Sequence, residues 1–343
     1  MEGSENLLGV IMAGGRGTRL MPLTANRPKP MVPVLGRPVI DYVKDAMVAA
    51  GLSEIIVTTG YQGEQLVEHV DTWSVSSRVN QEESPMGTAG SVRLLSNELQ
   101  ETFVVGSGDS VASFDITDLL RSHRKSGAKV TMALWRVDDP TEYGIVGLSE
   151  ENQGEINSDL TEGYISRFKE KPKADEAFSN LINAGLYIIE PEVMELVPEG
   201  QKYDFSKQLF PDVLSRGWPM YAKTVNGIWF DVGHPFELHN AQMALVSGRN
   251  ELPFPMPDGE VLPDGSFISK SASVSGHVEN SIVLDGASVN GAIVNSVVMA
   301  NSRVNGVAES SIIGENCSID SRIHNCVIGD DSHIIIDLQN ERR

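Results

Sequence analysis

A glycine-rich loop with two arginines follows the first apolar run of the chain. The run Leu7–Met12 leads into Ala13-Gly14-Gly15-Arg16-Gly17-Thr18-Arg19-Leu20. Glycines let backbone N–H groups approach a polyphosphate closely, and guanidinium groups neutralise its charge. The loop has no Gly-Lys-Ser/Thr, so it is not a Walker A loop, and it lacks the third glycine of a dinucleotide fingerprint. By itself it fits a phosphate site and equally well a glycine-rich turn with surface arginines.

The elements that would position this loop alternate between apolar runs and helical patterns. After Leu7–Met12, further strand-like runs lie at Glu54–Thr59, Thr102–Val105 and Val130–Leu134. One helical pattern runs through Val39, Ile40, Val43, Met47 and Val48 and stops at Gly51, and another spans Ile116–Arg124 with Asp115 as its cap. This alternation predicts an α/β domain whose mostly parallel sheet is covered on both faces. Ligands of such sheets collect beyond the C-terminal ends of the strands, where the glycine loop lies.

The tail repeats with a period of fifteen residues. Two columns are β-branched: Ile268, Val283, Val298, Ile313, Ile328 and Val274, Val289, Val304, Ile319, Ile334. Two more hold small residues: Ala272, Ala287, Ser302, Cys317, Ser332 and Ser281, Ser296, Ser311, Cys326. With Asn and Gly at the corners, the pattern predicts a parallel β-solenoid of stacked coils. Cys317 and Cys326 stand in columns of small residues, so we expect both to be packed and chemically inert.

A segment rich in proline and glycine precedes the repeat. It contains Pro253, Pro255, Pro257, Gly259, Pro263 and Gly265. Such a segment forms neither a helix nor a central strand, and 343 residues exceed what one hydrophobic core usually supports. We therefore predict a catalytic domain at 1–252, a linker at 253–265 and a repeat domain at 266–337.

The charge of the chain excludes some classes of partner. Forty-seven acidic against 27 basic residues give a formal charge of −20, which repels nucleic acid and anionic membrane surfaces. The first six residues lack the basic start and apolar core of a signal peptide, and no stretch of eighteen uncharged apolar residues occurs. The two cysteines form no metal or disulfide pattern. We expect a cytoplasmic protein that binds neither nucleic acid nor membranes.

A lysine between two prolines follows the glycine loop, in Arg27-Pro28-Lys29-Pro30. Because its backbone has little freedom, this lysine suits a positioned charge. The stretch from Gly14 to Pro30 resembles the signature of the sugar-1-phosphate nucleotidyltransferases, which include the GDP-mannose, glucose-1-phosphate and ADP-glucose pyrophosphorylases. The resemblance implies a Rossmann-like α/β domain with a mixed sheet and, in the tail, a left-handed β-helix. It also implies that Arg19 and Lys29 hold the triphosphate, with nucleotide contacts from Ala13, Gly14, Gly15, Arg16, Gly17 and Thr18.

The segment from Glu82 to Gly90 resembles the part of this family that reads the nucleobase. The resemblance implies nucleotide contacts from Glu82, Pro85, Gly87 and Thr88. A carboxylate suits the two neighbouring donors of guanine, whereas Gln81 would suit a pyrimidine if the loop shifted by one residue. The segment and the tail resemble mannose-1-phosphate guanylyltransferases, which favours GTP and mannose 1-phosphate. Glucose 1-phosphate with UTP or dTTP remains the alternative.

Two aspartates match the positions of the family's magnesium ligands. Asp109 follows the run Phe103-Val104-Val105, and Asp231 lies in Trp229-Phe230-Asp231-Val232-Gly233. Mg²⁺ is commonly held by one or two carboxylates together with phosphate oxygens and water, so two aspartates suffice. Either one alone would be an ordinary loop carboxylate. The resemblance therefore implies Mg²⁺ as cofactor and Arg19, Lys29, Asp109 and Asp231 as the catalytic set.

Three short pieces resemble the family's sugar pocket: Tyr143-Gly144, Phe168-Lys169-Glu170-Lys171-Pro172 and Asn183-Ala184-Gly185. The resemblance implies that Glu170 and Asn183 bind sugar hydroxyls and that Lys171 faces the sugar phosphate. The sugar phosphate would attack the α-phosphorus in line with the departing pyrophosphate, without a covalent enzyme intermediate.

Two alternatives concern the tail and the catalytic set. Solenoids of this kind also resemble acyltransferases that use a histidine, and His277, His324 and His333 lie in or beside the coils. Solvated corner residues are the ordinary interpretation of these histidines. A non-catalytic, regulatory sugar-nucleotide-binding protein is the other alternative, although all four catalytic candidates are present. We expect the β-helix to assemble a homo-oligomer.

Overall fold

The computed structural model describes residues 7–60, 63–248 and 254–343. These residues form two compact units, neither of which is continuous in sequence. The first comprises the stretch ending at Gly14 together with Val43–Gly108 and Ala112–Trp229, and the second comprises Gly15–Tyr42, Asp109–Val111 and the stretches from Phe230 to Arg343. Positions 1, 252 and 253 of the predicted domain boundaries lie outside the described residues. No helix in the described part of the chain is long and apolar enough to cross a membrane.

The first unit is built on a nine-stranded sheet in the order β5-β4-β1-β6-β11-β8-β12-β10-β9. Its strands are β1 (Leu8–Met12), β4 (Glu54–Thr59), β5 (Ser76–Gln81), β6 (Phe103–Ser107), β8 (Val130–Arg136), β9 (Gly144–Ser149), β10 (Glu162–Glu170), β11 (Leu181–Ile189) and β12 (Met220–Thr224). All four apolar runs of the sequence are strands. The sheet is parallel from β5 to β6, but β11 and β10 are antiparallel to their neighbours. The four predicted apolar runs all point the same way, since β8 and β6 are both antiparallel to β11, and β12 is parallel to β8, which agrees with a mostly parallel sheet. The exceptions, β10 and β11, are not among those runs. The mixed sheet implied by the family resemblance is confirmed.

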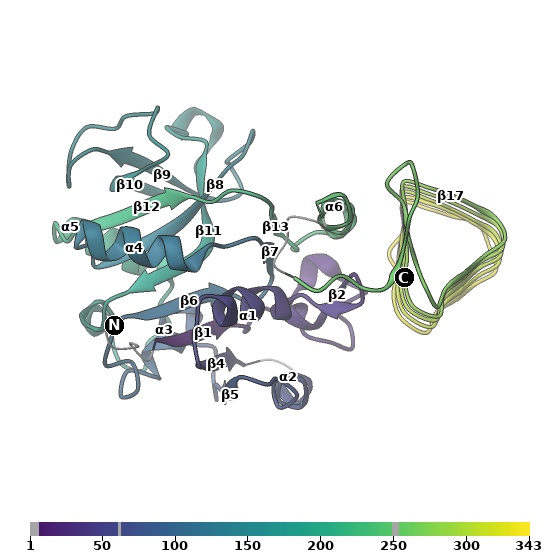
Figure 1. The fold of residues 1–343 in the computed structure, drawn as a ribbon, viewed down its shortest axis with the longest axis horizontal. Helices are drawn as coiled ribbons and strands as arrows, with labels where there is room; N and C mark the ends of the chain where they lie inside the picture. Colours follow the sequence, from purple (N-terminus) through teal and green to yellow (C-terminus); the bar gives the residue numbers. More distant parts are fainter. Residues whose placement is uncertain (1–6, 61–62, 249–253) are drawn as a thin grey trace. The chain divides into compact units, whose positions relative to one another are not determined.

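Helices cover both faces of this sheet (Figure 1). They are α1 (Ile40–Ala49), α2 (Gly63–Val70), α3 (Gly87–Arg93), α4 (Ile116–Ser126) and α5 (Phe210–Ser215), with the short helices η3 (Ala174–Glu176), η4 (Pro191–Leu196) and η5 (Phe205–Leu209). Val10 of β1 packs in one core with Val92 of α3 and Phe210 of α5. On the opposite face a Cβ at Gly106 would lie 2.6 Å from Val43 Cγ1, so the missing side chain lets α1 approach the sheet. The predicted cap of α4 is confirmed, since Asp115 accepts a hydrogen bond from the Asp118 N–H at 2.9 Å.

The second unit combines the signature segment with helix α6 and the repeat. Its short elements are η1 (Thr18–Leu20), η2 (Lys29–Met31), β2 (Pro33–Val34) and β3 (Arg37–Pro38), and α6 spans Pro235–Ser247. Gln242 of α6 accepts a hydrogen bond from the Leu35 N–H at 2.9 Å, which fixes the β2–β3 turn. The strands β7 (Ser110–Ala112) and β13 (Trp229–Asp231) form a separate two-stranded sheet.

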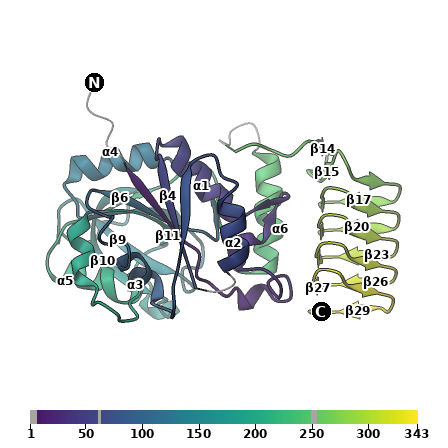
Figure 2. The same ribbon diagram turned by 90° about the horizontal axis from the view of Figure 1, so that it is seen from below.

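The repeat folds into three ladders that are parallel, apart from one edge strand that pairs antiparallel with its neighbour. Their coils stack one upon another in Figure 2 and outline a triangle in Figure 1. The strands are β14 (Gly259–Val261), β15 (Phe267–Ser269), β16 (Ser273–Val274), β17 (His277–Glu279), β18 (Ile282–Val283), β19 (Ser288–Val289), β20 (Ala292–Val294), β21 (Val297–Val298), β22 (Arg303–Val304), β23 (Val307–Glu309), β24 (Ile312–Ile313), β25 (Ser318–Ile319), β26 (Arg322–His324), β27 (Val327–Ile328), β28 (His333–Ile334) and β29 (Leu338–Gln339). Both predicted columns of β-branched residues pair in register. The parallel β-helix is confirmed, and its strand pattern is consistent with the left-handed form.

The polar columns of the repeat satisfy the backbone inside and at the corners. The Ser296 N–H donates to Ser281 Oγ and the Ser311 N–H to Ser296 Oγ, each at 3.0 Å. At one corner Asn280 Nδ2 donates to Asn295 Oδ1 at 2.7 Å, and both asparagines have positive φ. Cys317 and Cys326 are buried and unpaired with each other, as their columns indicate, and burial raises the pKa of the Cys317 thiol.

Candidate active site

Lys29 lies at the centre of the charged cluster of the second unit. Its side chain is only 8% exposed, and Nζ lies 2.5 Å from Asp109 Oδ2 and 2.9 Å from Asp231 Oδ1. Lys29 begins η2, and Pro28 before it has the extended conformation (φ −69°, ψ 153°) that its ring permits. Pro30 after it limits the backbone of the lysine itself. The three catalytic candidates, distant in sequence, therefore meet in one cluster.

The two aspartates reach Lys29 from the ends of two paired strands. Asp109 immediately precedes β7 and Asp231 ends β13, and the Val232 N–H donates to the Asp109 carbonyl at 3.1 Å. Their side chains are 28% and 29% exposed. The carboxylates are thus accessible to a ligand, whereas the lysine that joins them is buried.

Lys29 remains charged in this setting. Burial lowers its pKa, but the Coulombic attraction and hydrogen bonds of Asp109 and Asp231 outweigh burial and raise it above the ordinary value of 10.5. A lysine in this cluster can therefore act as a fixed positive charge and not as a proton donor near neutral pH.

Gly17 packs against the stem of this lysine. Its φ is +64°, and a Cβ there would lie 2.9 Å from both Lys29 Cβ and Thr24 Cγ2. Thr24 Oγ1 in turn donates to the Gly17 carbonyl at 2.8 Å. A residue with a side chain would be strained in this conformation and would displace Lys29. At this glycine the loop therefore has a structural requirement of its own.

Arg19 lies at the exposed side of the cluster. Its side chain is 60% exposed, and Nη2 is 3.9 Å from Asp231 Oδ2. Gly233 leaves the space for this pair, because a Cβ there would lie 2.9 Å from Arg19 Nη2 and 3.1 Å from the Asp231 carboxylate. The role of Gly233 was not predicted from the sequence, although a glycine two residues after a candidate ligand is a usable signal.

The other loop residues are divided between the units. In the second unit Gly15, Arg16 and Thr18 are exposed. In the first unit Ala13 is buried at the end of β1, where its N–H donates to the Thr58 carbonyl at 2.8 Å, and Gly14 is exposed.

In the first unit, Glu82 holds the segment that follows β5. Its carboxylate accepts a hydrogen bond from the Met86 N–H at 2.9 Å and another from Ser91 Oγ. The side chain predicted to read the base thus also closes the turn around Pro85, which is exposed. The neighbouring Gln81 is exposed, and a Cβ at Gly63 would lie 3.2 Å from its Cδ atom.

The start of α3 is tied to a segment that sequence reasoning missed. Gly87 has φ +75°, and a Cβ there would lie 2.5 Å from the Tyr203 carbonyl, which accepts hydrogen bonds from the N–H groups of Ala89 and Gly90, each at 3.0 Å. Thr88 Oγ1 donates to Asp204 Oδ2 at 3.1 Å. The predicted nucleotide residues Gly87 and Thr88 are therefore positioned by residues 203–204.

Glu170 and Asn183 meet at the same missed segment, through Ser206. Asn183 Nδ2 donates to Ser206 Oγ at 3.3 Å and to the Tyr187 hydroxyl at 2.8 Å, and Glu170 also hydrogen bonds to Ser206. Burial and then the negative charge of Asp204 raise the pKa of Glu170. The structure thus brings two of the predicted sugar residues together. Asp204 could have been found as a helix cap, since its carboxylate accepts from the Ser206 N–H at 3.1 Å at the start of η5.

The remaining sugar candidates lie beside this pair. Gly144 pairs with Glu170 across β9 and β10, and a Cβ there would lie 2.8 Å from Glu170 Oε2. The Tyr143 ring packs edge-on against Trp229, with 5.6 Å between the ring centroids. The Lys171 N–H donates to the Tyr143 carbonyl at 2.9 Å, but its ammonium is exposed and lies 3.6 Å from Glu142.

The three histidines of the repeat do not form a cluster like that of a catalytic site. His277 pairs with Glu279, His324 with Glu309 and His333 with Asp320, and all three are well exposed. They stand in different columns of the repeat. Each therefore fits the ordinary interpretation of a solvated residue.

The acidic residues of the cluster are the candidate ligands for a metal ion. Across the residues that the structure describes, no group of three or more His, Cys, Asp or Glu side chains could hold a metal by itself. Asp109 and Asp231, however, are half-buried carboxylates held within reach of a single ammonium. This pair fits a hard divalent cation that takes its other ligands from phosphate and water.

The chain is similar in sequence to several known proteins. A sequence model of the family described as nucleotidyl transferase matches residues 8–248. The chain is 34% identical to a mannose-1-phosphate guanyltransferase of Eremothecium gossypii over 276 residues, which cover 78% of this chain and 73% of that protein. It is 35% identical to the enzyme of the same name from Saccharomyces cerevisiae over 66% of this chain and 61% of that protein. It is also 31% identical to a UTP–glucose-1-phosphate uridylyltransferase of Synechocystis over 65% of this chain and 59% of that protein.

Proposed function

The chain belongs to the nucleotidyl transferase family, and on that premise we propose that it joins GTP to mannose 1-phosphate, giving GDP-mannose and pyrophosphate. The observation that carries the proposal is the cluster in which buried Lys29 joins Asp109 and Asp231 beside Arg19. Such a cluster offers fixed positive charge and carboxylate ligands side by side, which is what transfer between phosphates requires.

Arg19 and Lys29 have different roles in the proposed reaction. The exposed guanidinium of Arg19 binds the outer phosphates of the triphosphate, where it makes charge-assisted hydrogen bonds. The buried ammonium of Lys29 fixes the two aspartates and supplies a positive charge to the reacting α-phosphate. The phosphate oxygen of the sugar attacks the α-phosphorus in line with pyrophosphate, so alignment and charge neutralisation replace a side-chain nucleophile.

Enzymes of this family generally use a divalent metal ion. We propose that Asp109 and Asp231 hold Mg²⁺, which when bound neutralises charge on the phosphate oxygens. The two aspartates keep their carboxylates at the exposed side of Lys29, as a shared ligand pair requires.

The choice of guanine rests on Glu82 and on relatives named for that activity. Two of the relatives above are mannose-1-phosphate guanyltransferases, and one is a UTP–glucose-1-phosphate uridylyltransferase. A carboxylate at position 82 accepts hydrogen bonds from both donors of guanine, whereas uracil places an acceptor beside its donor. Glu82 also accepts from the Met86 N–H, so base recognition and the shape of the turn depend on the same carboxylate.

Sugar recognition is assigned to Glu170 and Asn183. Their common partner Ser206 holds the carboxylate of Glu170 and the amide of Asn183 close together. The carboxylate accepts hydrogen bonds from sugar hydroxyls, and the amide donates to neighbouring hydroxyls. Tyr143 and Gly144 form the adjoining wall, and Lys171 provides an exposed positive charge for the sugar phosphate.

The experiment measures pyrophosphate release from mannose 1-phosphate or glucose 1-phosphate with each of five nucleoside triphosphates, in magnesium and in excess chelator. We expect the highest kcat/KM with GTP and mannose 1-phosphate and no turnover in chelator. An absence of product with GTP would end the guanylyl assignment, and the uridylyl alternative would follow from product with UTP and glucose 1-phosphate. An acyl-transfer assay with acetyl-CoA tests the alternative for the tail.

The assembly and location of the protein complete the proposal. The β-helix exposes Ile335 and Ile336 on its last coil, which supports its use as a contact between copies of the chain. Light scattering measures this, and a strictly monomeric protein would contradict it. The cytoplasmic location stays a prediction, to be checked by fractionation of cells that make the protein.

A further inference from the structure

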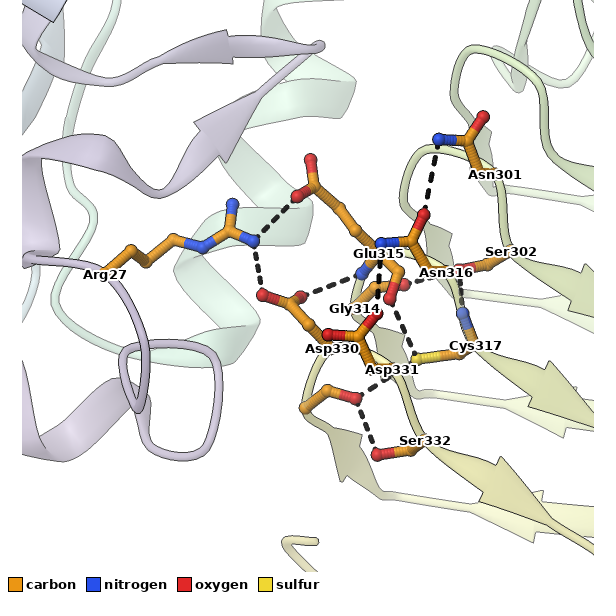
Figure 3. Close-up of polar contacts among 11 residues, drawn as sticks. Arg27, Asn301, Ser302, Gly314, Glu315, Asn316, Cys317, Asp330, Asp331 and Ser332 are labelled. Atoms are coloured by element: carbon orange, nitrogen blue, oxygen red, sulfur yellow. Dashed lines mark hydrogen bonds and ion pairs between the residues drawn. The ribbon is translucent and has the colours of Figure 1, made fainter. Parts of the chain in front are cut away.

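Arg27, two residues before Lys29, extends to two acidic residues of the repeat (Figure 3). Its Nη2 atom lies 2.7 Å from Glu315 Oε2 and also pairs with Asp330 Oδ2. The Arg27 side chain is 16% exposed and that of Asp330 is 11% exposed. Burial lowers the pKa of Arg27, and its two acidic partners raise it above the ordinary value. The pair of Arg27 with Asp330 differs from a solvated surface pair, because both of these side chains are largely removed from water.

The acidic corner is held in shape by its own backbone contacts. Asp330 uses its second oxygen, Oδ1, to accept a hydrogen bond from the Glu315 N–H at 2.8 Å. A Cβ at Gly314 would lie 2.6 Å from this oxygen, so the glycine leaves space for the carboxylate. The corresponding positions of earlier coils hold the buried, bulkier Leu284 and Met299. The coils that contact Arg27 therefore have a smaller residue at this corner than the earlier coils.

Two further contacts join the same coils to the signature segment. Arg342 Nη1, beside the last coil, donates to the Arg19 carbonyl at 2.7 Å. A Cβ at Gly329 would lie 3.0 Å from Pro22 Cβ, so a small residue there permits close contact. The coils thus contact the segment at Arg19 itself and, after the turn that carries it, at Pro22 and Arg27.

We propose that the fourth and fifth coils of the β-helix position the phosphate-binding loop of the enzyme, with Arg27 as the positioning residue. The link from Arg27 to the reaction is short, because Pro28 transmits its position to Lys29 and Gly17 packs on the lysine stem. The expected change in kcat/KM rests on the proposed function, whereas the expected change in the order of the loop does not. It gives the repeat a role in nucleotidyl transfer besides assembly.

The kinetic test compares Arg27→Gln, Glu315→Gln and Asp330→Asn with Arg121→Gln, a matched control that removes an exposed i,i+3 pair with Asp118. We expect each of the first three to lower kcat/KM for the triphosphate by roughly ten- to a hundred-fold, as a displaced phosphate loop would. The KM for the sugar phosphate should stay within about two-fold, and Arg27→Lys should restore part of the activity. The positioning role would be overturned if the KM for the sugar phosphate rose as much as kcat/KM for the triphosphate fell, or if kcat/KM for the triphosphate did not change.

The structural test measures amide hydrogen exchange in the full-length protein without substrates. The turn hydrogen bonds from Leu20 N–H to the Gly17 carbonyl (2.9 Å) and from Leu23 N–H to the Leu20 carbonyl (3.0 Å) report on the loop. We expect their exchange to be at least about ten-fold faster in Arg27→Gln and in Asp330→Asn, and unchanged in the control. Unchanged exchange in folded variants would refute the positioning. A wild-type protein that releases no pyrophosphate would instead refute the proposed function, because exchange requires no turnover.

Discussion

Replacing Lys29 by methionine removes the ammonium from the catalytic cluster while keeping most of the side-chain volume. Asp109 and Asp231 then face each other without the charge that lies 2.5 Å and 2.9 Å from them. Removing one partner of a fully buried ion pair costs about 3–5 kcal/mol. Because both aspartates are nearly 30% exposed, solvent reduces the cost to roughly 1–2 kcal/mol of unfolding free energy. The variant should fold, with its melting temperature lowered by a few degrees.

The effect on catalysis should be larger than the effect on stability. Loss of one preorganised charge at a reacting phosphate lowers kcat by roughly 10²–10³-fold. Pyrophosphate release and thermal unfolding measure the two effects separately. Lys129→Met is the control, because Lys129 forms an exposed pair with Glu192 at 2.5 Å. Adding Asp109→Asn to Lys29→Met should recover stability without activity. Retention of more than a tenth of the wild-type kcat by the single variant would refute the role given to Lys29.

Three other variants test separate parts of the site. Glu82→Gln should raise the KM for GTP by about ten-fold with a smaller change for UTP, measured by pyrophosphate release, and equal changes would limit Glu82 to holding its turn. Because burial raises the pKa of Glu170 in the folded state, its ionisation costs stability as the pH rises above its ordinary value of 4.5. Glu170→Gln should therefore gain stability relative to wild type between acidic and neutral pH in urea unfolding, while its KM for mannose 1-phosphate rises; a pH-independent difference would contradict this. Gly17→Ala should lose stability and activity, because it adds a contact with Lys29 to about 1–2 kcal/mol of left-handed strain. Gly36→Ala is the matched control, because Gly36 has φ +76° and open space at its Cβ, so this variant adds left-handed strain but no contact. Equal losses of stability in the two variants would argue against the contact with Lys29.

The local elements of the fold could be predicted because they depend on short patterns. Glu54–Thr59 was bounded correctly as a strand, and Asp115 was identified as the cap of α4. The two β-branched columns gave the register of the repeat directly, since each coil stacks on the next at a fixed spacing. The direction of β11 could not be found in this way. Strand direction depends on the path of the chain between strands, which apolar alternation does not encode.

The candidate site was predicted in part. Lys29, Asp109 and Asp231 were named from their motifs, but the motifs did not indicate that one buried ammonium would join both carboxylates. Ser206 was missed because a serine in a polar stretch carries no signal until Asn183 is seen beside it. Nothing in the sequence around Arg27 indicates its acidic partners, which lie about three hundred residues further along the chain.

By itself, the sequence determined the chemistry available to this protein: a glycine and arginine loop for phosphate, a lysine restrained by Pro28 and Pro30, and a tail that stacks by its own repeat. These are local properties, set by backbone freedom, side-chain charge and spacing. Only the tertiary structure decided which charges meet. The pairing of Lys29 with two distant aspartates, and of Arg27 with the last coils, depends on long-range packing that no single segment specifies.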